Sequence, residues 1–201
     1  MLAPIAPTEK QALVAFGANL SFGKMSPTET ISSAIAELES EGVTIFRLSR
    51  LYQTPCFPSG AGPDYLNAAA IVTLRHDQSI SEILAALHRV EAKFGRERVQ
   101  RWAGRTLDLD LLAVGESVLP DLQTFLQWRD LPAEAQGRLA PDQLILPHPR
   151  MQDRAFVLVP LAEVAPAWRH PVSGLSVLEM LEMLPAADRE AVVALPDGAA
   201  V

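Results

Sequence analysis

Two aspartates on one predicted strand are the residues of this sequence best suited to hold a metal ion. Asp108 and Asp110 alternate with Leu107, Leu109 and Leu111. Successive side chains of a strand point to opposite faces, so the carboxylates share one face and the leucines the other. Close carboxylates stay ionised together when a cation or arginines lie between them, and magnesium accepts such ligands beside phosphate oxygens and water. The alternative is a solvated strand face with two unrelated aspartates.

A basic stretch leads directly into this acidic strand. It contains Arg89, Lys93, Arg96, Arg98, Arg101 and Arg105, against Glu91 and Glu97. A guanidinium group matches phosphate oxygens with a planar fork of donors, and such groups stabilise the charge that develops in phosphoryl transfer. The combination predicts a site for a nucleotide with its metal. A charged segment that only solubilises the chain is the alternative.

A histidine between two prolines is a further candidate contact. His148 lies between Pro147 and Pro149, and Arg154 follows soon after. The prolines restrict the backbone, and a preset loop suits contact with a phosphate or a nucleobase. A histidine that only caps its own turn is the alternative.

Two other residues could contact a flat heterocycle, and a third is placed in the basic loop. Tyr65 and Asn67 lie two apart on a predicted strand and therefore share a face, where a ring can stack and a carboxamide can hydrogen-bond. Taken separately, each is more often structural. Trp102 is a large apolar residue inside the basic loop and is a candidate lid residue.

One common nucleotide-binding motif is excluded and a second is disfavoured. The spacing from Gly17 to Gly23 is one residue too long for a P-loop, and Met25 stands where a metal-binding Ser or Thr belongs. No G-x-G-x-x-G follows the first predicted strand, which disfavours a dinucleotide fold.

Hydrophobic patterning and helix-capping signals predict the elements that must position these residues. Ser26 with Glu29 and Ser79 with Glu82 are capping-box pairs at two helix starts. The expected order is a strand at 13–16, a helix from 26 to 42, strands at 43–52 and 65–74, a helix at 79–95 and a strand at 107–114. This order predicts an α+β, ferredoxin-like sandwich, an antiparallel sheet with helices packed on its face, followed by a C-terminal extension.

We expect a single domain with additions. Its expected parts are a disordered lead at 1–10, the domain at 11–190 with an insertion at about 121–143, and a flexible tail at 191–201. The insertion is expected to contain a short helix around 133–139. The extension resumes with apolar segments at 144–148 and 156–161 and an amphipathic helix near 177–184.

Composition narrows the class of protein. The 201 residues carry a net charge of −7 and one cysteine, Cys56. A negative chain is disfavoured as a general binder of nucleic acid or anionic membranes, and a single thiol excludes an internal disulfide and fits the cytoplasm. No apolar run approaches the length of a membrane span. We expect no nucleic-acid or membrane partner, and a monomer, with a weak dimer as the alternative.

Taken together, these motifs resemble the 6-hydroxymethyl-7,8-dihydropterin pyrophosphokinase family of folate biosynthesis. The resembling segments are 15–20 (AFGANL), 52–55 (YQTP), 65–68 (YLNA), 95–98 (GRER), Trp102, 105–110 (RTLDLD), 146–150 (LPHPR) and 154–156 (RAF). The resemblance extends over the whole chain apart from its first ten residues, the insertion and the last twenty or so. The resemblance implies an enzyme that binds ATP with two Mg²⁺ ions and then the pterin, whose hydroxymethyl oxygen attacks the β-phosphorus.

The resemblance also implies roles for individual residues. Asp108 and Asp110 would hold both metal ions, and Arg96 and Arg105 would act as catalytic phosphate clamps. The residues implied to bind ATP are Leu84, Glu91, Arg98, Arg101, His148 and Arg154. The residues implied to bind the pterin are Thr54, Pro55, Cys56, Phe57, Tyr65, Asn67, Trp102 and Phe156, with Tyr65 and Phe156 on either side of the ring. A loose transition state needs positioning and charge neutralisation more than a strong base.

Some positions depart from the family pattern. Gly104 replaces a proline common before the arginine, which loosens the approach to the strand. Val99 and Gln100 stand where some relatives carry a lysine, in a loop one residue shorter than in some. Cys56 and Phe57 alter the usual lining of the pterin pocket.

Two other functions remain as alternatives. A nucleic-acid-binding module on the same fold would need a basic sheet face with exposed aromatics, whereas this chain is acidic and only 6% aromatic. Another magnesium-dependent phosphoryl or nucleotidyl transferase is the nearer alternative, because a fold does not determine its chemistry.

Overall fold

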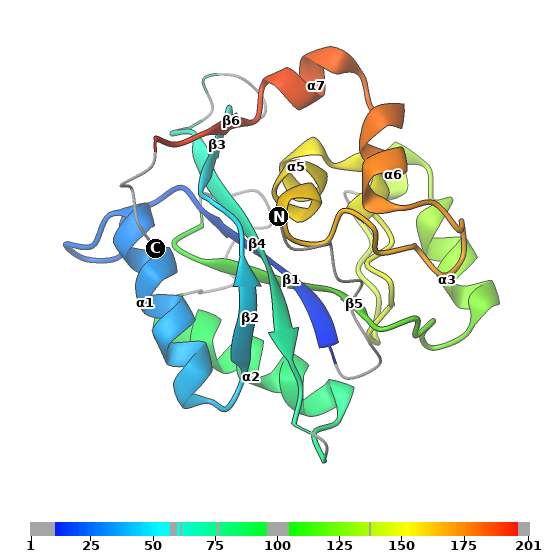
Figure 1. The fold of residues 1–201 in the computed structure, drawn as a ribbon, viewed down its shortest axis with the longest axis horizontal. Helices are drawn as coiled ribbons and strands as arrows, with labels where there is room; N and C mark the ends of the chain where they lie inside the picture. Colours follow the sequence, from blue (N-terminus) through cyan, green and yellow to red (C-terminus); the bar gives the residue numbers. More distant parts are fainter. Residues whose placement is uncertain are drawn as a thin grey trace.

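The computed structural model describes residues 11–56, 60, 62–75, 77–95, 105–136 and 138–196. Five of the predicted site residues, Phe57, Arg96, Arg98, Arg101 and Trp102, lie outside the described residues, as does Gly104. The elements are β1 (Gln11–Ala18), α1 (Pro27–Ser40), β2 (Thr44–Leu48), β3 (Tyr52–Thr54), β4 (Tyr65–Thr73), α2 (Ile80–Lys93), β5 (Asp108–Val114), α3 (Leu122–Arg129), α4 (Ala133–Gln136), a 3-10 turn (Met151–Asp153), α5 (Ala155–Val164), α6 (Val177–Met183), α7 (Ala186–Glu190) and β6 (Val193–Ala194) (Figure 1).

The described strands form one antiparallel sheet in the order β5-β1-β4-β3-β6, and β2 also pairs with β4. Both β2 and β3 lie along β4, so together they take the place of the one strand expected at 43–52. The interruption is at Ser49, whose hydroxyl accepts the Ala69 N–H at 2.9 Å in place of a backbone carbonyl. With β2 and β3 counted as one broken strand, the order is that of a ferredoxin-like sandwich, which confirms the predicted α+β class.

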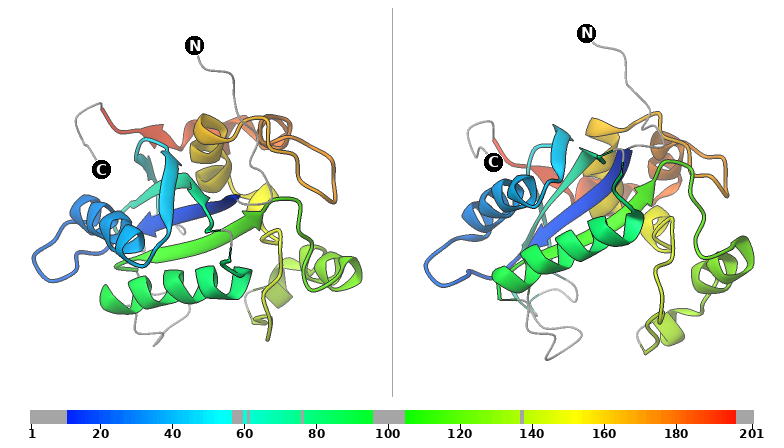
Figure 2. Two further views of the ribbon diagram at one scale, coloured as in Figure 1. Left: turned by 60° about the horizontal axis from the view of Figure 1, so that its bottom comes forward. Right: turned by 90° about the horizontal axis from the view of Figure 1, so that it is seen from below.

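Helices cover both faces of the sheet. Val14 and Phe16 of β1 belong to a core under α1 and α2, whereas Leu13 belongs to a second core under α5 and α6. Figure 2 shows α2 on one side of the sheet and α5 on the other. The sequence predicted helices on a single face, and the second layer comes from the C-terminal extension. The near-continuous apolar run of β1 is typical of a strand buried on both sides.

The predicted helix starts are confirmed. Ser26 and Ser79 each accept the backbone N–H of the glutamate three residues later, and each glutamate side chain accepts the serine N–H in return. These reciprocal bonds satisfy donors that a helix start otherwise leaves without partners. No helix in the described part of the chain is long and apolar enough to cross a membrane.

The insertion packs onto the C-terminal extension through an aromatic cluster. Helix α3 was not predicted, and the helix expected at 133–139 is the shorter α4. Phe125 of α3 is fully buried, with its ring centroid 5.6 Å from that of His170, which lies 5.9 Å from Trp168. The Trp168 indole N–H donates to Gly115 O at 3.2 Å. The insertion is therefore joined to the far end of β5.

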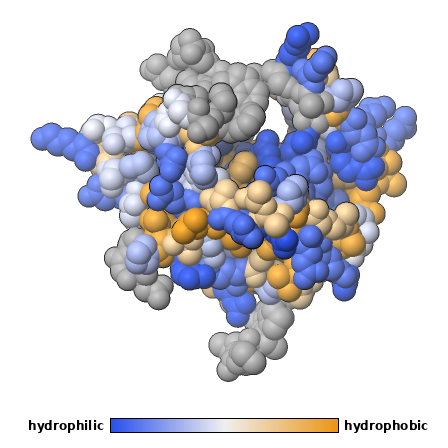
Figure 3. Space-filling model, turned by 90° about the horizontal axis from the view of Figure 1, so that it is seen from above, coloured by the Kyte–Doolittle hydropathy of each residue, from blue (hydrophilic) through white to orange (hydrophobic). Residues whose placement is uncertain are grey.

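The end of the chain also differs from expectation. Val193 and Ala194 lie inside the expected flexible tail, but they form β6 and pair with β3. The Leu195 N–H donates to Leu51 O at 2.8 Å. The side of the molecule seen from above mixes hydrophobic and hydrophilic side chains (Figure 3), and the exposed large hydrophobics belong to several separate elements.

We expect the stability of the fold to fall in acid because of His170. This residue is 3% exposed, and burial lowers its pKa from 6.5 to about 4, with Arg129 acting in the same direction. Between those pH values the unfolded chain binds a proton that the folded chain does not. The free energy of unfolding should therefore fall by about 3 kcal/mol as the pH decreases from 6.5 to 4.

Urea unfolding of the wild type and His170→Gln between pH 7 and pH 4 would measure this effect. The variant should lose much of the pH dependence. An identical dependence in both proteins would show that another group is responsible.

Candidate active site

Strand register places the predicted metal ligands beside the predicted pterin contacts. Asp108 on β5 pairs with Gly17 on β1, and Gly17 pairs in turn with Asn67 on β4. Directly opposed residues of antiparallel strands share a face. Asp110 lies one step further along the same face, opposite Ala15. The row of Asp108, Gly17 and Asn67 therefore forms the floor of one site on the face that carries α5.

Gly17 keeps the middle of this floor open. A Cβ atom at this position would lie 3.5 Å from Asn67 Oδ1 and 3.8 Å from Asp108 Cβ. Those distances are ordinary contacts, so an alanine would fit, but any longer side chain would extend into the space between the carboxylate and the carboxamide. Gly17 thus places no side chain between Asp108 and Asn67.

Two arginines lie against the two carboxylates. The Arg105 guanidinium bonds to Asp108, and Arg154 Nη1 is 4.0 Å from Asp110 Oδ2. Arg105 lies three residues before the start of β5, while Arg154 occupies the N-cap position of α5. Burial lowers the pKa of Arg154; Asp110 opposes this effect, and nearby Arg150 and Arg105 add to it. The two acidic and two basic groups thus form one electrostatic cluster.

His148 lies at the edge of this cluster. Its backbone N–H donates to Leu112 O at 2.7 Å, which attaches the proline-flanked turn to β5. Burial lowers the pKa of His148; Asp110 opposes this effect and Arg154 adds to it. The ring is therefore neutral at pH 7. Because Nδ1 accepts the Arg150 N–H at 3.1 Å, the proton of the neutral ring is on Nε2.

The predicted pterin contacts come from β3, β4 and the start of α5. The Asn67 carboxamide, which is 5% exposed, donates to Thr54 Oγ1 at 3.0 Å. Tyr65 pairs with Thr54 and lies two residues from Asn67 on the same face. Burial raises the pKa of Tyr65, and Arg105 partly opposes this effect. Phe156 is 38% exposed and has the Arg154 guanidinium 5.7 Å from its ring centre.

Two predicted nucleotide contacts lie elsewhere. Leu84 packs against the core under α1 and α2, on the opposite face of the sheet from the aspartates. Glu91 is 2% exposed on α2, and its carboxylate accepts the Leu109 N–H at 2.8 Å. The structure therefore places Glu91 beside the outer edge of β5 and does not bring either residue into the cluster.

Asn19 is part of this region although sequence reasoning assigned it no role. It directly follows β1, is 4% exposed, and its Oδ1 accepts the Arg105 N–H at 2.7 Å. The useful signal was present, because a polar residue immediately after a buried strand that enters the site is well placed to fix the adjoining loops. At the same end of the sheet, Thr106 Oγ1 donates to Phe94 O at 2.6 Å and joins the two ends of the basic loop.

The donor set fits magnesium. Asp108 and Asp110 supply two hard carboxylates on one face, and among the described residues no group of three or more His, Cys, Asp and Glu side chains could hold a metal. Magnesium commonly uses one or two carboxylates and completes its octahedron with substrate phosphates and water. A site with this composition suits a metal ion that arrives with a phosphate-bearing substrate.

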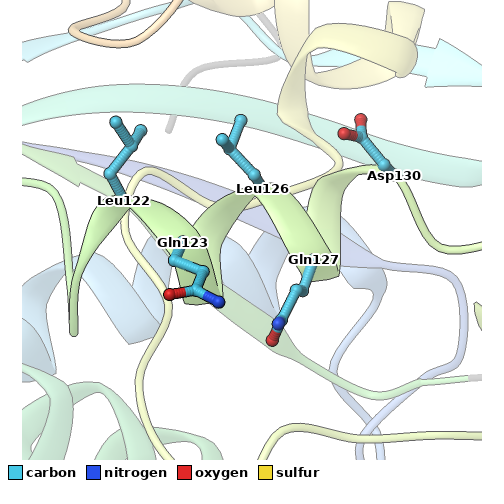
Figure 4. A pocket seen from close by; sticks show the side chains of 5 residues that line it. All are labelled: Leu122, Gln123, Leu126, Gln127 and Asp130. Atoms are coloured by element: carbon cyan, nitrogen blue, oxygen red, sulfur yellow. The ribbon is translucent and has the colours of Figure 1, made fainter.

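An open depression on the insertion has a different character. It measures about 530 Å³ and is lined by Leu122, Gln123, Leu126, Gln127 and Asp130, all on or next to α3 (Figure 4). The single titratable lining residue, Asp130, bonds to Arg129 through two contacts of 2.7 and 2.9 Å. The depression brings together no catalytic or metal-binding group, so we assign the chemistry to the carboxylate cluster.

The protein has a ferredoxin-like sheet, and one face of this sheet carries a cluster of two carboxylates and two arginines. A sequence model of the 7,8-dihydro-6-hydroxymethylpterin-pyrophosphokinase (HPPK) family matches residues 13–166. A 2-amino-4-hydroxy-6-hydroxymethyldihydropteridine pyrophosphokinase of Synechocystis is 37% identical over 189 residues, which cover 91% of this chain and 83% of the relative. A protein with the same name from Pseudomonas aeruginosa is 34% identical, over 88% of this chain and 93% of its own length. The chain therefore belongs to the HPPK family.

Solved structures agree on the fold. A crystal structure of HPPK-DHPS in complex with substrates matches with a TM-score of 0.58 at 11% identity, over 86% of this chain and 42% of that chain. Wild-type HPPK-DHPS of Plasmodium falciparum matches with a TM-score of 0.58 at 13% identity, over 86% of this chain and 44% of that chain. This chain thus spans less than half of those longer proteins.

Proposed function

We propose that this protein transfers a diphosphate group from ATP to the hydroxymethyl group of 6-hydroxymethyl-7,8-dihydropterin, in folate biosynthesis. The observation that carries the proposal is the row of Asp108, Gly17 and Asn67, which joins a carboxylate pair between arginines to a carboxamide beside an aromatic ring. Membership of the HPPK family supports the same reaction.

The proposed reaction is a group transfer and needs no redox cofactor. The pterin hydroxymethyl oxygen forms a bond to the β-phosphorus of ATP, and the bond from that phosphorus to the oxygen bridging the α- and β-phosphates breaks. The bridging oxygen leaves with AMP, and the hydroxyl proton passes to solvent. The products are AMP and the pterin diphosphate.

The residues of the cluster would neutralise the phosphate charge in two ways, by holding metal ions and by direct contact. Asp108 and Asp110 would hold two Mg²⁺ ions, which would neutralise phosphate charge and make the β-phosphorus more electrophilic. Arg105 and Arg154 would contact phosphate oxygens as fixed positive groups, with Arg96, Arg98 and Arg101 as further clamps in the basic loop. His148, neutral with a proton on Nε2, would donate a hydrogen bond to the nucleotide. Leu84 and Glu91, both outside this cluster, are the remaining proposed ATP contacts.

The neighbouring groups would hold the pterin. Tyr65 and Phe156 would stack on its two faces and Asn67 would bond to its polar edge. Residues 54–57 would complete the pocket, and Trp102 would close over it. Fixing the alcohol in line with the β-phosphorus supplies much of the rate enhancement expected for a transfer of this kind.

Two further properties belong to the same proposal. The single thiol of Cys56 supports a reducing compartment, and we place the reaction in the cytoplasm. We propose a monomer as the working form, with a weak dimer as the alternative.

Product analysis tests the reaction. The chain would be incubated with Mg²⁺, the hydroxymethyl pterin and ATP labelled in its β-phosphate, and the products separated by chromatography. Equal amounts of AMP and labelled pterin diphosphate are expected. Formation of ADP would indicate a different phosphoryl transferase, and absence of turnover by a folded protein would contradict the proposal.

A further inference from the structure

Asn19 bonds to segments that belong to both proposed substrate sites. Its Oδ1 accepts the Arg105 N–H at 2.7 Å, and its Nδ2 donates to Pro63 O at 3.1 Å. Arg105 is a proposed phosphate clamp, whereas Pro63 ends the loop that begins at the proposed pterin contacts Thr54 to Cys56. One buried carboxamide therefore connects the nucleotide side of the site to the pterin side.

The backbone reinforces the contact with Arg105. The N–H groups of Asn19 and Leu20 both donate to Arg105 O, at 2.9 and 3.1 Å. Together with the Oδ1 contact, these bonds satisfy both the backbone N–H and the backbone C=O of Arg105. The backbone of Arg105 is thereby fixed against the end of β1, which sets the direction from which its guanidinium reaches Asp108.

The contact with the pterin loop is supported by close packing. A Cβ atom on Gly62 would lie 3.6 Å from Cys56 Sγ and 3.9 Å from Asn19 Nδ2. Cys56 stands at the start of the loop and Gly62 near its end, so both ends of the loop meet beside the Asn19 carboxamide. Displacement of the Asn19 carboxamide would therefore affect both ends of the loop.

Only a carboxamide of this length can make both side-chain bonds. Oδ1 faces a backbone donor and Nδ2 faces a backbone acceptor, so the two ends of the group are not interchangeable. An aspartate could still accept from Arg105, but it would place a negative oxygen against the Pro63 carbonyl. An apolar side chain would leave both backbone groups without these partners, and unmade buried hydrogen bonds are costly.

We propose that Asn19 is a positioning residue that couples the phosphate clamp to the pterin loop and so sets the relative placement of the two substrates. The proposal rests on the function proposed above. Asn19 contacts neither reacting group and acts through Arg105 and Pro63. Its removal should therefore reduce the energetic coupling between the two binding sites, in addition to any effect on stability.

The test measures the binding of Mg²⁺ with a non-hydrolysable ATP analogue and of the pterin, each alone and each in the presence of the other, by isothermal titration calorimetry. For Asn19→Asp, we expect the dissociation constant of the pterin to rise roughly tenfold or more and that of the nucleotide to change by less than about threefold. For Asn19→Ala, both constants should rise, and the factor by which one ligand tightens the other should fall toward one.

Trp168→Phe is the matched control. It removes a buried side-chain bond to a backbone carbonyl, that to Gly115 O at 3.2 Å, at the far end of β5. It should lower the melting temperature without changing either dissociation constant or their coupling. If the Asn19 variants lose stability but keep the wild-type coupling, Asn19 is only structural and the inference is overturned.

The outcomes separate this inference from the proposed function. Wild-type protein that fails to form AMP and pterin diphosphate would contradict the proposed function. Wild-type protein that forms both products, with Asn19 variants that bind both ligands like the wild type, would contradict the inference alone. Should Asn19→Ala fail to fold, Asn19→Asp decides through the unequal changes of its two dissociation constants.

Discussion

Replacement of Asp110 by asparagine should lower kcat about a thousandfold or more while leaving the protein folded. Asparagine has the size of aspartate but no charge, so it binds Mg²⁺ poorly and no longer balances Arg154 at 4.0 Å. The side chain is 35% exposed and belongs to neither core. In the free protein, loss of the attraction to Arg154 and loss of the repulsion between the two carboxylates act in opposite directions. The melting temperature should therefore change little.

Steady-state formation of AMP at several Mg²⁺ concentrations measures this effect. Asp142→Asn is the matched control, because Asp142 is an exposed aspartate of the insertion and the same charge is removed. It should keep the wild-type rate. Wild-type turnover and Mg²⁺ dependence in Asp110→Asn would show that Asp110 is not a metal ligand. A parallel loss in Asp108→Asn would support shared metal binding by the pair.

The arrangement of the acidic strand was predictable because it depends on local rules. Alternation of Asp108, Leu109 and Asp110 determines which side chains share a face, and β5 has that alternation, with the leucines in the core under α1 and α2. Capping boxes at Ser26 and Ser79 determined the starts of the two helices. Such features need only a few neighbouring residues, so the ferredoxin-like order followed from the sequence.

Features that depend on distant contacts were not predictable in this way. The break between β2 and β3 arises because the Ser49 hydroxyl replaces a backbone group in pairing with Ala69, and a run of β-branched residues does not reveal that exchange. The second helical layer depends on α5 packing against β4 from far along the chain. The role of Asn19 depends on contacts with Pro63, which is 44 positions further along the chain, and with Arg105, which is 86 positions further along.

The packing of the insertion is the clearest example of a feature that depends on distant contacts, and substitution of Phe125 tests it. We expect Phe125→Ala to lower the free energy of unfolding by about 3–5 kcal/mol, the usual cost of removing a fully buried phenylalanine side chain. The ring is 0% exposed and packs against His170, which lies against Trp168. Its loss would leave a cavity between α3 and the C-terminal extension. Urea unfolding at pH 7 measures the change.

Leu122→Ala on the same helix separates packing from helix propensity. Leu122 is 51% exposed, so its truncation should cost well under 1 kcal/mol. Turnover by Phe125→Ala should match the wild type at temperatures where the variant stays folded, because the aromatic cluster attaches at Gly115, next to the end of β5 opposite the aspartates. If kcat falls in folded Phe125→Ala protein, the insertion also influences the active site. Retained kcat with reduced stability would show that the insertion stabilises the C-terminal extension. It would thereby also support α5, the helix whose first residues flank the site.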